Sequence, residues 1–211
     1  MDTILRWHNP PPSHTYDQSR DVHTIRATPS SDFWRTTTER RDTGNFLHQP
    51  GVRGNFRVQC FIKGTWVHEY DQAGLMVRVV EGEEGGKNER WIKTGIELMG
   101  GVQYVSAVVT NPYSDWSLTP SAHPTTFTSS HLLFLELERK GPVIYIRHGF
   151  APADDELAKE ALRSGERSLT MLRKVTGFAN GVEAMDLGIS VACPKNQEGV
   201  EVEVEGFRIL Q

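Results

Sequence analysis

The chain has 211 residues, of which 37% are hydrophobic and 24% charged, a composition typical of a globular protein with one substantial core. Its net charge of −4, without any cluster of Lys and Arg, argues against a nucleic-acid-binding surface. No apolar run approaches the roughly 18 residues that a membrane-spanning helix needs, and the first residues lack the basic and apolar regions of a signal peptide. We therefore expect a cytoplasmic protein with no membrane partner.

The first 20 residues are polar and proline-rich, with three consecutive prolines at 10–12. We interpret residues 1–20 as an edge element or loosely ordered arm, in which Trp7 is the residue that reaches a core. A single β-sandwich domain is expected to follow over residues 21–211.

From Val22 onward, short runs of β-branched and aromatic residues alternate with turn signals about ten residues apart, the signature of an all-β sandwich or barrel. The predicted strands are 22–28, 32–37, 45–48, 55–62, 72–80, 91–98, 103–110, 131–139, 142–148, 168–174, 184–193 and 200–210. The charged, glycine-rich segment 81–90 is interpreted as a long hairpin loop.

One short helical insert is predicted over 153–165. Acidic residues at 154–156 suit the first turn of a helix, an apolar stripe follows, and Gly165 is a plausible stop. In the last strand, Val200, Val202 and Val204 alternate with glutamates, whereas Phe207 falls on the glutamate parity. We therefore predict a β-bulge at Gly206.

The two cysteines, Cys60 and Cys193, are interpreted as buried structural residues rather than a disulfide or metal site. The eight histidines are scattered and show no metal-ligand spacing, so neither a metal nor a cofactor is predicted.

The segment 70–79 alternates between two kinds of side chain. One parity is small and aliphatic from Ala73 to Val79, as a face packed on a core should be. The other parity is large and able to hydrogen-bond, and it includes Tyr70, Gln72 and Arg78. Asp71 lies on the core parity, so it is as plausibly a buried brace bonded to backbone as a catalytic acid.

The segments 91–98 and 103–110 show the same division, and we expect them to be neighbours of 72–80. Their polar faces would then merge into one wall, with the loop 111–117 folding over its rim. The predicted ligand-binding residues are Tyr70, Gln72, Arg78, Trp91, Lys93, Glu97, Asp115 and Trp116. Aromatic rings and convergent polar groups suit a small-ligand site, although an ordinary solvated sheet face has a similar composition.

The runs YDQAGLMVR at 70–78, WIKTGIE at 91–97 and VVTNPYSDWS at 108–117 resemble the "regulation of enolase" protein family, found in bacteria and fungi. The segment 32–35 (DFWR) and Cys193-Pro194 resemble its flanking motifs. The resemblance spans roughly residues 30–210. It implies a concanavalin A-like jelly-roll sandwich of two antiparallel sheets, in a family without an agreed molecular function.

Three functions remain open from the sequence. The first is a non-catalytic protein that binds a small carbohydrate or a sugar-phosphate-like metabolite, with Lys93 and Arg78 holding an anionic group and a regulatory role in carbon metabolism. The second is a protein–protein regulatory module that acts on a glycolytic enzyme such as enolase. The third is a glycoside-active enzyme that uses Glu97 with Asp71 or Asp115, since such enzymes need two carboxylates.

Overall fold

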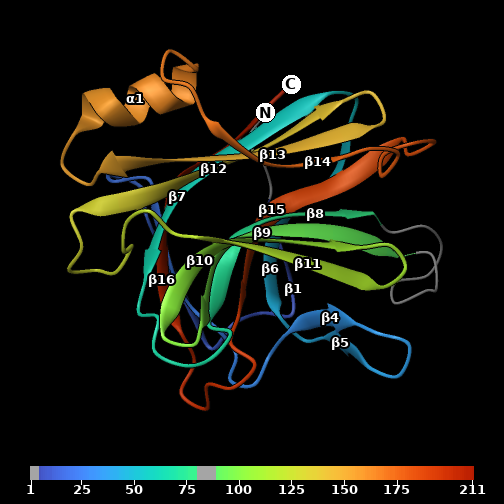
Figure 1. Cartoon of the computed structure of the whole chain (residues 1–211), viewed down its shortest axis with the longest axis horizontal. Helices are drawn as coiled ribbons and strands as arrows, with labels where there is room; N and C mark the ends of the chain where they lie inside the picture. The colour runs from blue at the N-terminus through green and yellow to red at the C-terminus, as the bar shows by residue number, and fades with distance from the viewer. Residues whose placement is uncertain (1–4, 80–88) are drawn as a thin grey trace.

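The computed structural model describes residues 5–79 and 89–211, and within them two seven-stranded antiparallel sheets face each other (Figure 1). Sheet A has the order β1 (Arg6–His8), β6 (Asn45–Arg53), β15 (Ala184–Ala192), β8 (Gln72–Val79), β9 (Arg90–Met99), β10 (Val102–Thr110) and β11 (Ser114–Pro120). Sheet B has the order β14 (Thr170–Val175), β13 (Val143–Pro152), β12 (His131–Lys140), β7 (Phe56–Gly64), β16 (Glu201–Leu210), β3 (Val22–Arg26) and β2 (Ser13–Asp17). The predicted sandwich of two antiparallel sheets is confirmed.

The core lies between the sheets and takes the aliphatic parity of each strand. Leu75 of β8, Ile92 of β9, Val58 of β7 and Leu135 of β12 are completely buried there. Full burial of such a side chain contributes roughly 1.5–3 kcal/mol. Because a strand turns successive side chains to opposite faces, this burial forces the polar parity of β8 and β9 onto the outer face of sheet A.

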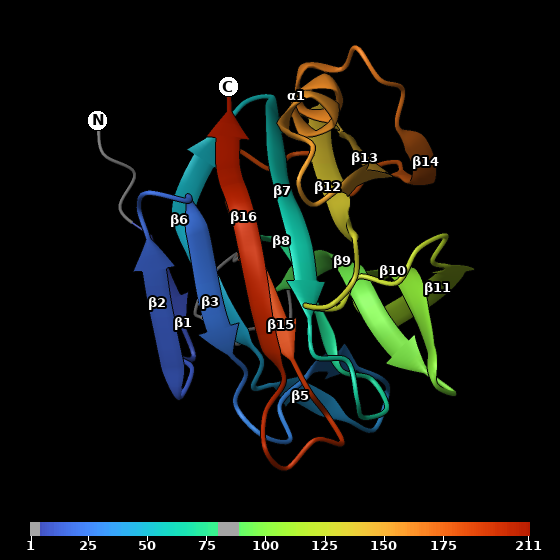
Figure 2. The same ribbon diagram turned by 90° about the vertical axis from the view of Figure 1, so that its left-hand side faces the viewer.

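The N-terminal residues are part of both sheets. β1 pairs with β6 at the edge of sheet A, and β2 pairs with β3 at the edge of sheet B, as Figure 2 shows at the left. The prolines at 10–12 lie between these strands, where the chain crosses from one sheet to the other and no ladder hydrogen bond is needed. Trp7 packs against the core, as predicted. The domain boundary after residue 20 stays a prediction.

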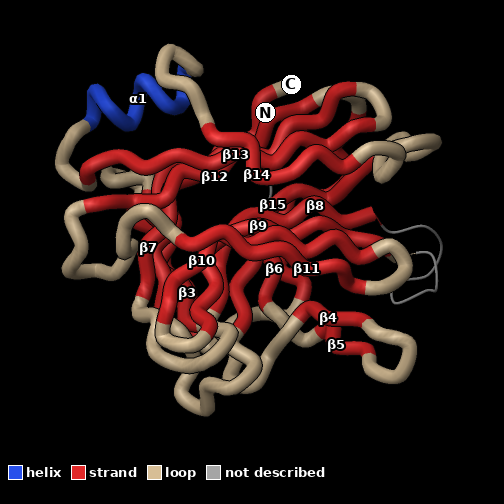
Figure 3. Tube along the Cα trace, in the orientation of Figure 1, coloured by secondary structure: helices blue, strands red, loops and turns tan. Residues whose placement is uncertain are grey.

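The single helix among the described residues, α1 (Glu156–Ser164), lies outside sheet B (Figure 3). Asp155 caps it by accepting a hydrogen bond from the Ala158 amide, and Gly165 ends it in the left-handed conformation. Leu162 packs beneath the helix on Phe61 and Phe134 of sheet B. The predicted insert is therefore confirmed.

Local backbone predictions gave mixed results. The register of β16 shifts between Glu205 and Arg208, so the bulge at Gly206 (φ 63°) is confirmed. The prediction of a loop at 111–117 is wrong for the second half of that segment, because Ser114–Pro120 forms β11 and pairs along β10. The sequence of this edge strand is polar, so it lacks the apolar alternation by which a strand is predicted. The predicted loop 81–90 lies almost entirely outside the described residues.

A two-stranded hairpin, β4 (Phe33–Arg35) and β5 (Arg40–Asp42), lies against the outer face of sheet A (Figure 1). Phe33 and Phe46 pack there with Met76 and Trp91 in a small apolar cluster separate from the main core. The hairpin covers one part of the polar outer face of β8 and β9 and leaves the other part accessible.

Candidate functional site

β8 and β9 place the predicted wall on one surface. They pair antiparallel with Gln72 opposite Glu97, Met76 opposite Lys93 and Arg78 opposite Trp91. The predicted merging of the two polar faces is therefore confirmed. Gly74 and Gly95 also face each other, and a Cβ on either glycine would lie 1.8 Å from a carbonyl oxygen of the opposite strand. Only glycine permits this close approach of the two strands.

The hairpin covers the half of this surface that carries Arg78 and Trp91. Arg78 is 2% exposed and Trp91 is fully buried. The Trp91 ring meets Phe33 edge to face at 6.5 Å, and the Arg35 guanidinium lies 4.7 Å from its centroid. The expectation that Arg78 and Trp91 line the binding wall is thus corrected, because the β4–β5 hairpin, which is distant from them in the sequence, covers both side chains.

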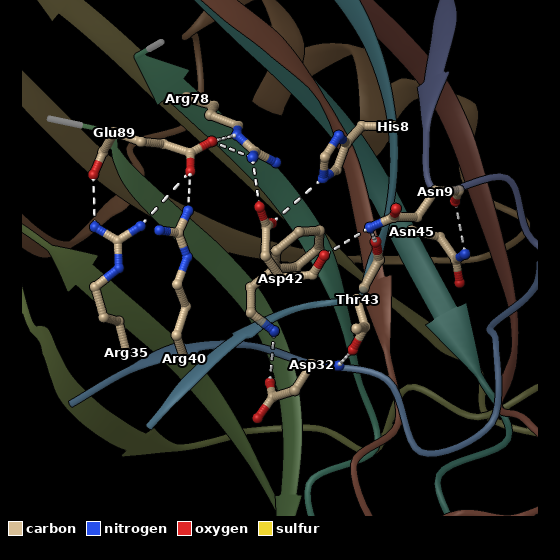
Figure 4. Close-up of polar contacts among 12 residues, drawn as sticks. His8, Asn9, Asp32, Arg35, Arg40, Asp42, Thr43, Asn45, Arg78 and Glu89 are labelled. Carbon is tan, nitrogen blue, oxygen red and sulfur yellow. Dashed lines mark hydrogen bonds and ion pairs between the residues drawn. The ribbon is translucent and has the colours of Figure 1, made fainter. Parts of the chain in front are cut away.

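A charged cluster fastens the hairpin to the sheet (Figure 4). The Glu89 carboxylate pairs with Arg78 and accepts a hydrogen bond from Arg40 Nη2 at 2.9 Å. The backbone carbonyl of Glu89 accepts a hydrogen bond from Arg35 Nη1 at 2.8 Å. Arg78 Nη2 also donates to Asp42 Oδ2 at 2.7 Å. Burial alone would raise the pKa of Asp42, but the hydrogen bond from His8 and the charge of Arg78 hold that pKa below its ordinary value. The opposite charges of these groups pair with one another, although Arg78 Nη1 and Arg35 Nε are buried without a hydrogen-bond partner in the described part of the chain, so the cluster is structural.

The other half of the surface opens into a cavity of about 270 Å³ beside the hairpin. Five of the predicted residues line it: Tyr70, Gln72, Lys93, Glu97 and Trp116. Six further residues, which the sequence-based list lacks, complete the lining: Asp32, Trp34, Glu39, Arg41, Pro194 and Lys195. The sequence did contain a signal for these residues, because the flanking motifs at 32–35 and 193–194 include Asp32, Trp34 and Pro194.

The floor of the cavity is a buried polar network. Gln72, Lys93 and Glu97 are 8%, 6% and 5% exposed. The Lys93 ammonium donates to the Gln72 side-chain carbonyl and lies 3.5 Å from Asp32 Oδ1. Burial raises the pKa of Glu97, and the positive charge of Lys93 opposes this shift. A ligand here would meet donors and acceptors already fixed in position.

Three half-buried aromatic rings form the walls above this floor. Trp116 makes edge-to-face contacts with Trp34 at 6.4 Å and with Tyr70 at 6.1 Å. Its indole N–H donates to Glu97 Oε2 at 3.0 Å, which ties the wall to the floor. The lining therefore combines flat apolar faces with a small number of oriented polar groups.

Asp71 braces the backbone that presents Tyr70. Tyr70 has a φ of 67°, which is strained for a bulky side chain and costs of order 1–3 kcal/mol. The fully buried Asp71 accepts from the amides of Val67 and His68 at 3.0 and 2.9 Å, and from the Asn196 side chain. Asp71 is thus bonded as a structural residue at the start of β8.

Asp115 lies outside the cavity lining. It is exposed, and its carboxylate pairs with Arg173 Nη2 at 2.6 Å across to sheet B. Neither Asp71 nor Asp115 shares the cavity with Glu97. Asp32 and Glu39 are the carboxylates that do.

The sequence matches over residues 7–211 a family described as "Protein of unknown function (DUF1349)". The chain belongs to this family. "Regulation of enolase protein 1" of Saccharomyces cerevisiae is 38% identical over 115 residues, which are 53% of this chain and 52% of the yeast protein. The "Uncharacterized protein AN7484" of Emericella nidulans is 31% identical over 99 residues, or 46% and 48% of the two chains. The match thus spans about half the length of each curated relative, and the resemblance to the regulation-of-enolase family is confirmed.

Solved structures share the fold of this family member. A functionally unknown protein from Saccharomyces cerevisiae superposes with a TM-score of 0.76 at 24% identity, covering 97% of this chain and 95% of the other. The legume lectin-like domain from Entamoeba histolytica gives 0.54 at 9% identity, covering 98% and 89%. A xylan beta-1,4-xylosidase from Bacillus halodurans gives 0.58 at 9% identity, covering 90% of this chain and 33% of the enzyme. At these identities the likeness concerns the fold alone.

No helix in the described ranges is long and apolar enough to cross a membrane. In the same ranges, no group of three or more His, Cys, Asp or Glu side chains is arranged to hold a metal ion.

Proposed function

We propose that this protein binds a small carbohydrate-like molecule in the cavity between the β4–β5 hairpin and the outer face of sheet A. The observation that carries the proposal is the placement of three aromatic rings over a buried floor of Gln72, Lys93 and Glu97. Sugars present C–H groups that pack on aromatic faces and hydroxyls that both donate and accept, so this lining suits them.

Burial of the polar floor argues against an ordinary wet surface. On a solvated sheet face, Lys and Glu side chains extend into water and are seldom fully buried. Lys93 and Glu97 are instead held beneath aromatic walls, at a cost in desolvation that exposed positions would avoid. A site kept at such a cost is better explained by ligand binding than by sheet stability.

Arg78 does not hold an anionic group of the ligand as expected, because it forms ion pairs with Glu89 and Asp42. Lys93 remains, and Arg41 and Lys195 lie on the cavity lining. The proposal therefore covers neutral sugars and sugar phosphates. The two free, buried cysteines, Cys60 and Cys193, support a reducing cytoplasmic location.

A thermal-shift screen against neutral monosaccharides and sugar phosphates tests the proposal. A ligand present at 100 times its Kd stabilises the protein by about 2.7 kcal/mol. We expect Lys93→Met to abolish the shift and Trp116→Phe to weaken it, because the second variant keeps a ring but loses the bond to Glu97. Tyr113→Phe, at an exposed residue outside the lining, is the matched control.

Unchanged sugar binding in both cavity variants would contradict the proposal. If Lys93→Met and Trp116→Phe fold normally and keep the wild-type response to every sugar that shifts the wild-type protein, the cavity is not the binding site. Trp91 is left unchanged in these tests because its removal would damage the small core under the hairpin.

A second candidate is a protein–protein regulatory module that acts on enolase. The name of the yeast relative, "Regulation of enolase protein 1", favours it. Purified enolase would be tested for capture by the full chain and by a variant in which residues 81–88 are replaced with a Gly/Ser linker. Capture that the replacement abolishes, without any response to sugars, would support this candidate over the first.

We do not extend the proposal to glycoside cleavage. That reaction needs a second carboxylate facing the scissile bond, and the two expected partners of Glu97 are elsewhere. Asp71 is bonded to backbone amides and Asp115 pairs with Arg173. Of the two carboxylates that do line the cavity with Glu97, Asp32 accepts from the Phe33 amide and lies 3.5 Å from Lys93 Nζ, and Glu39 pairs with Arg41.

A further inference from the structure

A second cavity, of about 620 Å³, lies on the opposite side of the sandwich, on the outer face of sheet B. Its lining residues come mainly from β16, from the turn between β2 and β3 and from the helix α1. Figure 2 shows β16 between the β2–β3 pair and α1. The lining of the cavity includes five basic side chains: Arg20, Lys63, Lys159, Arg163 and Arg208. Three acidic side chains accompany them on the lining. Two further carboxylates outside the lining also pair with the basic groups: Glu203 lies 3.0 Å from Lys63 Nζ and 3.8 Å from Arg20 Nη2, and Glu160 lies 3.7 Å from Arg163 Nη1.

Two of the three acidic groups of this cavity, Glu156 and Glu205, are already paired with cations. Glu205 accepts from Lys159 Nζ at 3.0 Å and lies 3.5 Å from Arg163 Nη2. Lys159, 3% exposed, also binds Glu156 at 2.8 Å. The backbone carbonyl of Asp21 binds the Gly206 amide, and the Asp21 side chain accepts from Tyr16. Glu156 and Glu205 therefore belong to internal ion pairs, whereas the exposed Asp21 carboxylate is hydrogen-bonded to Tyr16 only among the described residues.

Arg208 is the basic group left without a carboxylate. Its Nε donates to the Gln59 side-chain carbonyl at 2.9 Å, and no ion pair joins it to another residue in the described part of the chain. Burial lowers the pKa of Arg208 and the nearby charge of Arg163 lowers it further, while Glu160 raises it and Arg57 has a smaller lowering effect. An added anion would relieve this repulsion.

The bulge in β16 creates this arrangement. Residues 205 and 208 are three apart, so a regular strand would turn them to opposite faces. The register shift between Glu205 and Arg208 instead turns both toward the cavity. At Gly206, φ is 63° and a Cβ would lie 2.9 Å from Arg163 Nη2, so glycine lets the Arg163 guanidinium lie directly over the strand. Bulges of this kind commonly re-aim side chains at functional sites.

We propose that this cavity is an anion site that takes a phosphorylated small molecule, with Arg208 and Arg163 as the principal donors to its phosphate. Guanidinium groups offer paired N–H donors that match phosphate oxygens and bind them with charge-assisted hydrogen bonds. The site lies on the sheet opposite the proposed carbohydrate cavity and does not depend on it.

Calorimetric titration of the full chain with inorganic phosphate and with glycerol 1-phosphate tests this proposal, with chloride holding the ionic strength constant. We expect Arg208→Gln to weaken phosphate binding at least ~10-fold, the loss of one charge-assisted contact, and Arg208→Lys to weaken it less. The matched control is Arg53→Gln, at an exposed ion pair with Glu183 outside both cavities. Lys93→Met provides the control for the first cavity.

Three results would overturn the proposal: no phosphate binding beyond a chloride effect, wild-type affinity in Arg208→Gln, or loss of binding in Lys93→Met instead. Should Arg208→Gln fold poorly, the wild-type protein still gives a test. The Nε–H resonance of Arg208 should shift on addition of phosphate, and an unchanged resonance at saturating phosphate would contradict the assignment.

Discussion

Glu97 is a carboxylate whose surroundings favour its protonated form. Burial raises its pKa, and the opposing effects of Lys93, Ser106 and Trp116 do not fully reverse that shift. The folded protein therefore holds the proton more tightly than the unfolded chain, so this group costs stability as the pH rises above the ordinary Glu value.

Glu97→Gln should consequently raise the melting temperature at pH 7, because the amide needs no desolvation of a charge. The gain should shrink as the pH falls toward the ordinary Glu pKa. Glu138→Gln is the control of opposite sign: burial alone would raise its pKa, but Arg147 and Lys140 hold it below the ordinary value. That variant should lose stability at pH 7. Thermal unfolding of all three proteins between pH 4 and 8 measures both effects, and a loss in both variants would refute the account of Glu97.

At the scale of elements, the β4–β5 hairpin divides one sheet face into a sealed half and an open half. Gln72 and Arg78 share a face of β8, yet Gln72 reaches the cavity and Arg78 lies beneath the hairpin. The alternation in 70–79 predicts the shared face. It contains no information on which part residues 33–42 will cover, because that depends on the packing of Phe33 on Trp91.

Removing Arg78 should loosen this hairpin. Arg78→Met leaves the buried Glu89 and the half-buried Asp42 without their shared partner, and breaking a buried pair costs about 3–5 kcal/mol. Arg53→Met, at a pair whose side chains are 71% and 82% exposed, should cost less than ~1 kcal/mol. Urea unfolding compares the two variants. Equal, small losses would mean that the charged cluster does not hold the hairpin.

At the scale of the whole molecule, the N-terminal segment closes one side of the sandwich in both sheets. β1 and β2 belong to different sheets, and Leu5 and Trp7 pack against the main core. A composition rich in Pro and polar residues left both an edge element and a loosely ordered arm open, because three-residue and five-residue edge strands leave little periodicity to detect.

Deletion of residues 1–17 should therefore destabilise the protein instead of trimming an appendage. Trp7 is half-buried, so the loss of its contacts alone is expected to cost less than the ~3–5 kcal/mol of a fully buried Trp. Chemical unfolding of the truncated and full chains, with Trp7→Ala as the intermediate variant, measures this cost. An unchanged unfolding midpoint would show that the segment is an arm after all.

The resemblance of three motifs to a known family implied the sandwich. The residue pattern alone predicted an all-β fold, one short helix that stops at Gly165, the bulge at Gly206 and the core faces of β8, β9 and β10. These follow from local periodicity and from backbone requirements that neighbouring residues impose. The packing of distant segments brings Tyr70, Gln72, Lys93, Glu97 and Trp116 together with Trp34 and Asp32 in one cavity, and it buries Arg78 and Trp91 under the hairpin. The reason is physical: alternation assigns a side chain to a face, but contacts between segments far apart in the chain decide whether that face is covered.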